Sequence, residues 1–354
     1  MNPSRIQQDA VYVIGVGAQT PVGRNALSAA AAVRCGISAY AEHPFMIDKH
    51  GEPMVVVRAD WLDGSVDGKD RMIRFGIDAA IDALASAHVF KQTSLPIIFA
   101  LSSANLPQDA DRRMVVEKIE VGLREKCGNI RHHICVDLNA VGAEALRLAC
   151  EYLKNSGNGL CLVLGVDSHL GSEQLETIDN SGRLHSVNNS WGFTPGEGAG
   201  AVLLATGRAI SQGKLKPLAE IAAVATGSEG KLLGTRTVCI GEGLSQAFRG
   251  ALSSSEKVSH SYCDLNGETY RADEFGFAVC RTSDCFHDAG SFTAAAECWG
   301  DVGAASVPLQ VALATSAWSR GYAKGDISLC WSSSASSSLR GAIRLRNNWR
   351  GERN

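Results

Sequence analysis

The chain has 354 residues, of which 20% are charged, with a formal net charge of -3 and no long basic stripe, so electrostatic binding of nucleic acid has little support. Its longest apolar runs, such as residues 160–166, are too short to cross a bilayer, and residues 1–9 lack the apolar core of a signal peptide. We therefore expect a cytoplasmic protein without a membrane span, built as one large or two closely packed α/β lobes.

Strands and helices alternate from the start of the chain. Residues 10–16 are a short, largely β-branched run that predicts a buried strand, and this run leads into a turn rich in Gly and Pro. An alanine-rich helix is expected next, and residues 40–70 are expected to form loops and short strands. The first half then predicts helices at 25–35, 71–87, 112–127 and 138–155, and further strands at 95–101, 130–136, 160–166 and 202–205.

The same pattern restarts after a polar join at residues 207–217. It predicts strands at 219–225, 261–264, 327–331 and 339–345, and helices at 244–252 and 304–320. Alternation of this kind is typical of mostly parallel sheets that are covered by helices. We place an N-terminal lobe at residues 1–214 and a C-terminal lobe at 215–354, and we interpret the serine run 332–338 as a turn between two strands.

Eleven cysteines are scattered singly through apolar segments. None forms a Cys-x-x-Cys pair, and an odd number argues against a closed disulfide framework. The nine histidines also lack ligand spacing such as His-x-x-x-His. We expect most cysteines to be small buried hydrophobes in a reducing compartment, and we predict neither a metal nor a cofactor.

Several segments, taken in order, resemble the β-ketoacyl-acyl-carrier-protein synthases of the thiolase-like superfamily. The nearest match is the glycine-rich stretch 192–201, whose buried Glu197 needs a partner. The other similar segments are 15–23, 71–84, 139–145, 162–167, 207–221 and 303–305. The resemblance implies two pseudo-symmetric βαβαβ lobes in α-β-α-β-α layers, and a homodimer. A dinucleotide-binding turn at Gly15 and Gly17 is disfavoured, because position 20 is Thr and Pro21 follows.

The resembled enzymes use a cysteine at a helix N-terminus to take an acyl group. Aligning on Gly142 without a gap places Ile134 at that position, and Ile cannot attack a thioester. Cys135 follows directly and would serve only if the turn were one residue shorter, because a one-residue shift turns a strand side chain to the opposite face. Both interpretations stay open: a buried core cysteine, or a shifted nucleophile.

The two histidines of the resembled family are also missing. Asn266 stands at the first position, where it can donate a hydrogen bond to a carbonyl but cannot act as a general acid or base near neutral pH. Gly300 stands at the second position. The serine run replaces a Phe-Gly loop that supplies an oxyanion donor, which predicts a different backbone path. The polar residues 264–274 are expected to be a solvated loop with an Arg–carboxylate pair.

Three functions compete. The first is a thiolase-fold pseudoenzyme without decarboxylative condensing activity, acting as a scaffold, accessory or chaperone-like binding protein for a protein partner. In this it resembles stand-alone synthase-like proteins encoded in bacterial type VI secretion effector clusters. The second is an active acyltransferase or condensing enzyme that uses Cys135 and Asn266, with His132 or His133 as base, and an acyl carrier protein as partner. The third is a hydrolase; its residues would be Ser102 or Ser103, His169 or His185, and Asp167, but no Gly-x-Ser-x-Gly elbow exists.

Overall fold

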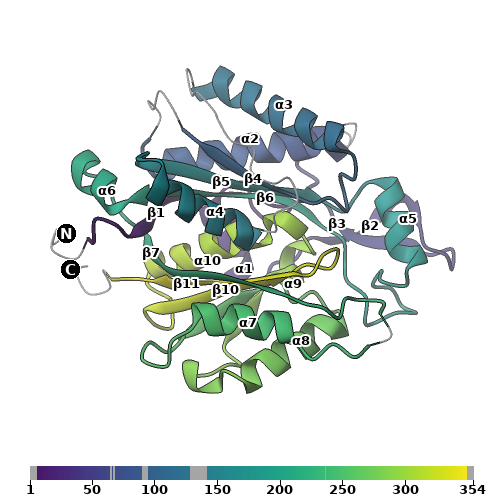
Figure 1. Cartoon of the computed structure of the whole chain (residues 1–354). Coiled ribbons are helices and arrows are strands. Elements are labelled where there is room, and N and C mark those ends of the chain that lie inside the picture. Colours follow the sequence, from purple (N-terminus) through teal and green to yellow (C-terminus); the bar gives the residue numbers. More distant parts are fainter. Residues whose placement is uncertain are drawn as a thin grey trace.

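A computed structural model describes residues 6–63, 66, 68–89, 95–127, 142–235 and 237–348. Its main feature is a nine-stranded sheet in the order β4-β5-β6-β1-β7-β11-β10-β8-β9, with helices on both faces (Figure 1). The strands of this sheet are β1 Val11–Gln19, β4 Ile97–Leu101, β5 Leu160–Ser168, β6 Glu197–Thr206, β7 Ala219–Ser228, β8 His260–Cys263, β9 Phe292–Ala294, β10 Ile327–Ser333 and β11 Leu339–Arg346. A separate two-stranded ribbon is formed by β2 Tyr40–Ile47 and β3 Pro53–Val57.

The sheet is built from two similar halves. The order β4-β5-β6-β1 in the first half is repeated as β8-β10-β11-β7 in the second, and the halves meet at only two residue pairs between β1 and β7. The described helices are α1 Ala26–Arg34, α2 Gly68–Ser86, α3 Asp109–Cys127, α4 Gly142–Asn155, α5 Ser172–Asn180, α6 Gly207–Gly213, α7 Glu242–Ala251, α8 Thr269–Cys280, α9 Ala296–Trp299 and α10 Ser306–Arg320.

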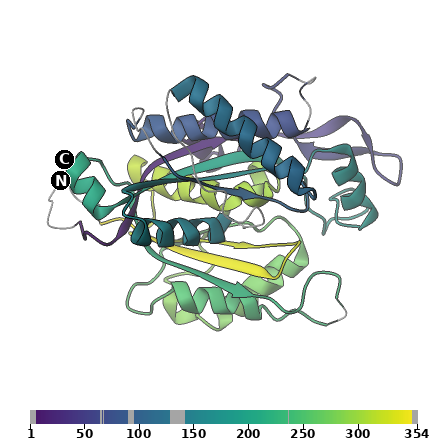
Figure 2. The same ribbon diagram turned by 45° about the horizontal axis from the view of Figure 1, so that its top comes forward.

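Helices form three layers around the two halves of the sheet. α1, α4 and α10 lie between the halves, where they share one hydrophobic core with strands of both (Figures 1 and 2). α2 and α3 cover the outer face of the first half, and α7 and α8 cover the outer face of the second. The molecule therefore has the expected α-β-α-β-α layers. The predicted lobe boundary at residue 214 stays a prediction.

The sheet is not mostly parallel, contrary to the prediction from the alternating pattern. Five of the eight strand pairings within it are antiparallel, among them β5 with β6 and β10 with β11. The serine turn joins β10 directly to β11 and reverses the chain, so these neighbours must run in opposite directions. Parallel pairing is confined to β4–β5, β8–β10 and β8–β9.

The opening glycines serve close packing between β1 and α2. A side chain at Gly17 would place its Cβ 1.9 Å from the carbonyl oxygen of Ala79, and one at Gly15 would lie 2.3 Å from that of Ala83. Only glycine lets a strand and a helix approach this closely. β1 continues through both glycines to Gln19, so they do not form a phosphate-binding turn.

Most predicted elements are present within a few residues of their expected bounds, and the serine run is a turn as expected. The predicted strand 130–136 lies outside the described residues. α5, α6, α8, α9 and β9 were not predicted. Among the described helices, none is both long enough and apolar enough to span a membrane.

Candidate functional site

A cavity of about 340 Å³ lies at the carboxyl ends of the parallel strands of both halves. Asp167 belongs to the end of β5, Asp264 follows β8 directly, and Ser333 is the last residue of β10. Ligand sites of α/β proteins are commonly found at this edge of the sheet. The cavity is therefore the candidate functional site.

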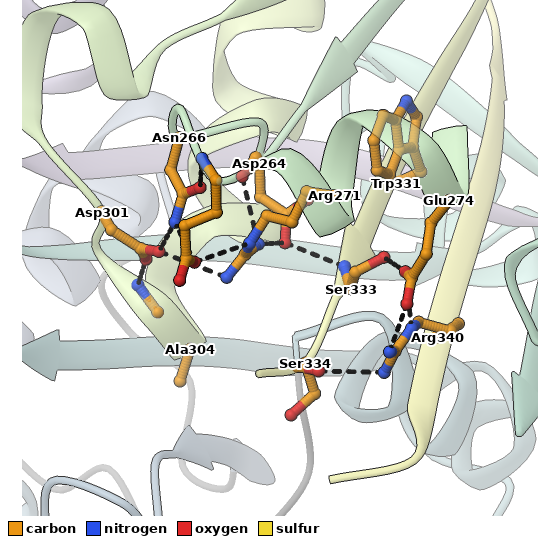
Figure 3. Close-up of polar contacts among 12 residues, drawn as sticks. Asp264, Asn266, Arg271, Glu274, Asp301, Ala304, Trp331, Ser333, Ser334 and Arg340 are labelled. Atoms are coloured by element: carbon orange, nitrogen blue, oxygen red, sulfur yellow. Dashed lines mark hydrogen bonds and ion pairs between the residues drawn. The ribbon is translucent and has the colours of Figure 1, made fainter. Parts of the chain in front are cut away.

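Arg271, on the first turn of α8, lines the cavity and is the centre of a buried ion-pair network (Figure 3). Its Nη1 donates to the Asp264 carboxylate and, at 3.1 Å, to the Asp264 carbonyl oxygen, and its Nη2 donates to Asp301 Oδ2 at 3.2 Å. Glu268 Oε2 lies 3.7 Å from Arg271 Nε. One guanidinium therefore faces three carboxylates, and all four side chains are at most 7% exposed.

Burial and pairing act differently on the two aspartates. Burial raises the pKa of Asp264 to about 6, although Arg271 and the Ser333 N–H oppose this rise. Burial would also raise the pKa of Asp301, but Arg271, His169 and the Gly303 N–H together hold it far below its usual range. Asp301 is therefore ionised at every ordinary pH, whereas Asp264 titrates near neutrality.

The network continues from Asp264 to the rim of the cavity. Ser333 N donates to Asp264 Oδ2 at 2.8 Å, and Ser333 Oγ donates to Glu274 Oε2 at 2.7 Å (Figure 3). Glu274 in turn accepts from Nε and Nη2 of the buried Arg340 at 2.8 and 2.6 Å. Arg340 Nη1 donates to the carbonyl oxygens of Ser334 and Ser337 at 2.9 and 3.0 Å, so it holds the serine turn in place.

Asn266 is fully engaged in the same network. Its Nδ2 donates to Asp301 Oδ2 at 2.7 Å and to Glu268 Oε2 at 3.0 Å, and its Oδ1 accepts from Glu268 N at 3.1 Å. Gly300 has φ 72°, and a Cβ there would lie 2.9 Å from the carbonyl oxygen of Thr194. Neither residue offers a free hydrogen-bond donor of its side chain to the cavity.

One histidine, His169, does line the cavity. His169 follows β5; its Nδ1 accepts from Asn105 Nδ2 at 3.0 Å, and Asn105 Nδ2 also donates to Asp167 Oδ1 at 2.7 Å. His169 Nε2 lies 3.6 Å from Asp301 Oδ1, too far for a strong hydrogen bond. Burial opposes a charge on this ring, but the Asp301 and Asp167 carboxylates outweigh it and raise the pKa of His169.

The predicted hydrolytic set is only partly assembled. Asp167 and His169 are joined through Asn105, and Ser102 and Ser103 line the same cavity. However, Ser102 Oγ accepts from the Ala104 N–H, and no hydrogen bond between either serine and His169 is present among the described residues. The arrangement therefore lacks the nucleophile–base contact that hydrolysis requires.

The predicted nucleophile cannot be placed. Cys135, together with Ile134, His132 and His133, lies outside the described residues. None of the ten described cysteines lines the cavity, and six of them are buried, as expected for core thiols. Burial raises the pKa of Cys150 and of Cys161 to about 12, so these thiols are inert.

The polar segment 264–274 was wrongly predicted to be a solvated loop. The Arg–carboxylate pair is present, but it is buried, and most of the segment lies in α8. The residues that sequence reasoning missed are Asn105, Arg183 and Asp301, and His169 was named only as part of a hydrolytic set. Their only common signal is their position just beyond the ends of strands or in turns that the strands bring together.

One group of side chains, Glu229, Cys239 and Glu274, has ligand atoms within 4.8 Å of one another, close enough for a metal ion. Hydrogen bonds already account for this arrangement. Glu229 accepts from the Lys231 and Gly243 N–H groups at 3.0 Å each, and Glu274 is occupied by Arg340 and Ser333. The adjacent guanidinium makes this a poor cation site.

Comparisons with known proteins place the fold. No protein-family model and no curated protein matches the chain. Solved structures do match: the ishigamide ketosynthase/chain length factor has a TM-score of 0.76 at 13% identity, covering 96% of this chain and 100% of that one. A structure of a type II polyketide synthase acyl-carrier protein in complex with its ketosynthase matches at 0.73 and 15%, covering 96% and 99%.

The ketosynthase from module 6 of the bacillaene synthase of Bacillus subtilis 168 is a further match. It has a TM-score of 0.73 at 14% identity, covering 95% of this chain and 72% of that one. Sequence identities this low support a shared fold but not a shared activity. Together with the repeated strand order and the five layers, they show that the chain has the thiolase-like fold of the ketosynthases.

Proposed function

We propose that this protein is a ketosynthase-like pseudoenzyme of the cytoplasm that does not catalyse decarboxylative condensation and instead acts as a scaffold, accessory or chaperone-like binding protein. The observation that carries this proposal is the environment of Asn266. Asn266 stands at the position of the resembled family's first histidine, and its amide already donates hydrogen bonds to Asp301 and Glu268. A type VI secretion effector cluster is the setting we propose, and the homodimer belongs to the same proposal.

Condensation needs donors that stabilise negative charge on a thioester carbonyl oxygen as it develops. Asn266 would have to release the Asp301 and Glu268 carboxylates to serve, and leaving buried carboxylates without their donor is costly. Gly300 has no side chain to contribute. Both positions that would polarise the substrate are therefore ineffective.

Two backbone donors of the serine turn are also occupied. The N–H of Ser333 donates to Asp264, and the N–H of Ser334 donates to the carbonyl oxygen of Leu339. An oxyanion hole needs such groups to point at the substrate oxygen and to be unpaired before the reaction. Because these two N–H groups are paired within the protein, they stabilise the rim of the cavity and are not free to bind a substrate oxygen.

A binding role is supported by apolar surface beside the site. On β2 the side chains of Tyr40, Phe45 and Ile47 are exposed, and Phe45 is 86% exposed. Phe45 also borders a second hollow that shares Asn105 and Pro107 with the candidate site. Exposed apolar side chains gathered on one element favour a protein partner.

The test combines turnover with cysteine mapping. The protein is incubated with malonyl- and acyl-loaded acyl carrier protein, and carbon dioxide release and condensed product are measured; we expect neither above the background of a Cys135→Ala variant. Cerulenin and iodoacetamide labelling is read by intact mass, with Cys280→Ala as the matched control, because Cys280 is exposed on α8. Rapid selective labelling of Cys135 with product formation would instead establish the acyltransferase alternative, with the carrier protein as partner.

A further inference from the structure

The charges that line the cavity are unusual for a site that would receive an anion. The described residues of its wall include more carboxylates than guanidinium groups. The carboxylates are those of Asp167, Glu173, Asp264 and Asp301, and the guanidinium groups are those of Arg183 and Arg271. The imidazole of His169 also lines the wall, and even with this third basic group the four carboxylates leave negative charge in excess around the space that a ligand would fill.

Each basic group of the wall also lies near a carboxylate of the protein, and His169 Nε2 is 3.6 Å from Asp301 Oδ1. Arg271 is shared between Asp264 and Asp301. The Nε and Nη2 atoms of Arg183 donate to both oxygens of Glu268, at 2.7 and 2.9 Å. A ligand carboxylate would meet no uncompensated positive charge, and it would face several buried negative charges of like sign.

Arg183 nevertheless keeps a donor for a ligand. Its third nitrogen, Nη1, makes no hydrogen bond to the described residues, and its side chain is 26% exposed at the cavity wall. The guanidinium also lies over the ring of Phe193, 4.9 Å from its centroid, which fixes its direction. A donor whose charge is already balanced is suited to a neutral oxygen acceptor.

The remaining wall is partly apolar. Leu101, Pro107, Ile178 and Phe193 line the cavity alongside the polar groups. A volume of about 340 Å³ is at the small end of ligand sites, so it suits a short chain and not a large cofactor. The small volume and the paired charges of the cavity together favour a ligand with an uncharged head group and a short apolar tail.

We propose that this cavity binds a small uncharged molecule through a carbonyl oxygen, which accepts a hydrogen bond from Arg183 Nη1 while a short apolar chain lies against Phe193, Ile178 and Leu101. The inference rests on the proposed binding role of the same cavity and names its ligand class. It excludes malonate-like anions, because Glu268 and Asp301 already occupy the cations that would receive them.

Three probes with one chain length and different head groups test the proposal. Hexanamide, hexanoate and hexylamine are titrated against the full chain at pH 7 by ligand-observed NMR. We expect hexanamide to bind about ten-fold more tightly than either charged probe, the effect of one hydrogen bond to a charged donor. Tightest binding by hexanoate or by hexylammonium, or no saturable binding of hexanamide, would overturn the proposal.

Two variants place the ligand at Arg183. Arg183→Gln removes Nη1 and should weaken hexanamide about ten-fold, whereas Arg124→Gln, in an exposed pair on α3, should leave the affinity unchanged. Glu268→Gln leaves the charge of Arg183 unbalanced and should raise hexanoate affinity about ten-fold, which keeps the proposal testable if Arg183→Gln fails to fold. Unchanged hexanoate affinity in Glu268→Gln would count against it.

The two proposals fail separately. Condensation by the wild-type protein would refute the pseudoenzyme but would leave the ranking of the three probes intact. A wrong ranking would refute the uncharged ligand while the condensation assay stays negative.

Discussion

The two halves of the molecule each bury an arginine with carboxylates, and they do so differently. In the first half, Arg71 of α2 faces Glu197 of β6 in a two-pronged pair, with one distance of 2.8 Å and both side chains at most 3% exposed. In the second half, Arg271 faces Asp264, Asp301 and Glu268 at once. The first pair is balanced, and the second leaves an excess of carboxylate.

This difference coincides with the resemblance to the ketosynthases. Arg71 and Glu197 belong to two of the segments that resemble that family. Asp264, Arg271 and Asp301 occupy the segments in which the family's histidines are missing. The first-half pair therefore lies in a segment that resembles the family, whereas the Arg271 network lies where the family's histidines are expected.

The largest expected effect breaks the balanced pair. Glu197→Gln leaves the Arg71 cation buried without a counter-charge, which should lower the free energy of unfolding by about 3–5 kcal/mol in urea titrations. Asp78→Asn, which removes a partly exposed partner of Arg74 and Lys126, should cost less than about 1 kcal/mol. Equal effects of the two variants would contradict the view that burial determines how much an ion pair contributes to stability.

Removing the central arginine of the network should cost somewhat less. Arg271→Met leaves three carboxylates together, but Asp264 can take up a proton, so we expect a loss of about 2–4 kcal/mol at pH 7 that shrinks at pH 5. Urea unfolding at both pH values measures it. Arg249→Met, on the exposed face of α7, should change stability by less than about 0.5 kcal/mol. A loss that does not depend on pH would show that Asp264 does not relieve the charge.

The smallest expected effect concerns Asp264 alone. Its pKa of about 6 lies above its ordinary value, so the folded protein holds this proton more tightly than the unfolded chain. Stability from this group therefore rises as the pH falls from about 6 to 4, by about 1 kcal/mol from pH 7 to pH 5. Subtracting the pH profile of Asp264→Asn from that of the wild type isolates the contribution. A flat difference would place the pKa near its ordinary value.

Local patterns were enough to predict most of the strands, but not their directions in the sheet and not the buried network. β1, β5 and α2 could each be predicted from the apolar pattern of their own segment. Glu197 was expected to need a partner, and that partner is Arg71. The network joins residues 264–274 to Asp301 and to Ser333, and nothing local specifies contacts at such separations. The buried face of α8 carries the charged Arg271, so this helix lacks the apolar stripe by which periodicity detects an amphipathic helix.

The Arg340 clamp also fixes how long the serine turn can be. Its Nη1 donates to three carbonyl oxygens, those of Ser334, Ser337 and Leu339, in a turn that closes with the Ser334 N–H on Leu339. An inserted residue would change the spacing of these carbonyl oxygens around the buried guanidinium and weaken its hydrogen bonds to the turn. Surface loops usually tolerate insertions, but this one should not, so tags or reporter peptides belong elsewhere on the chain.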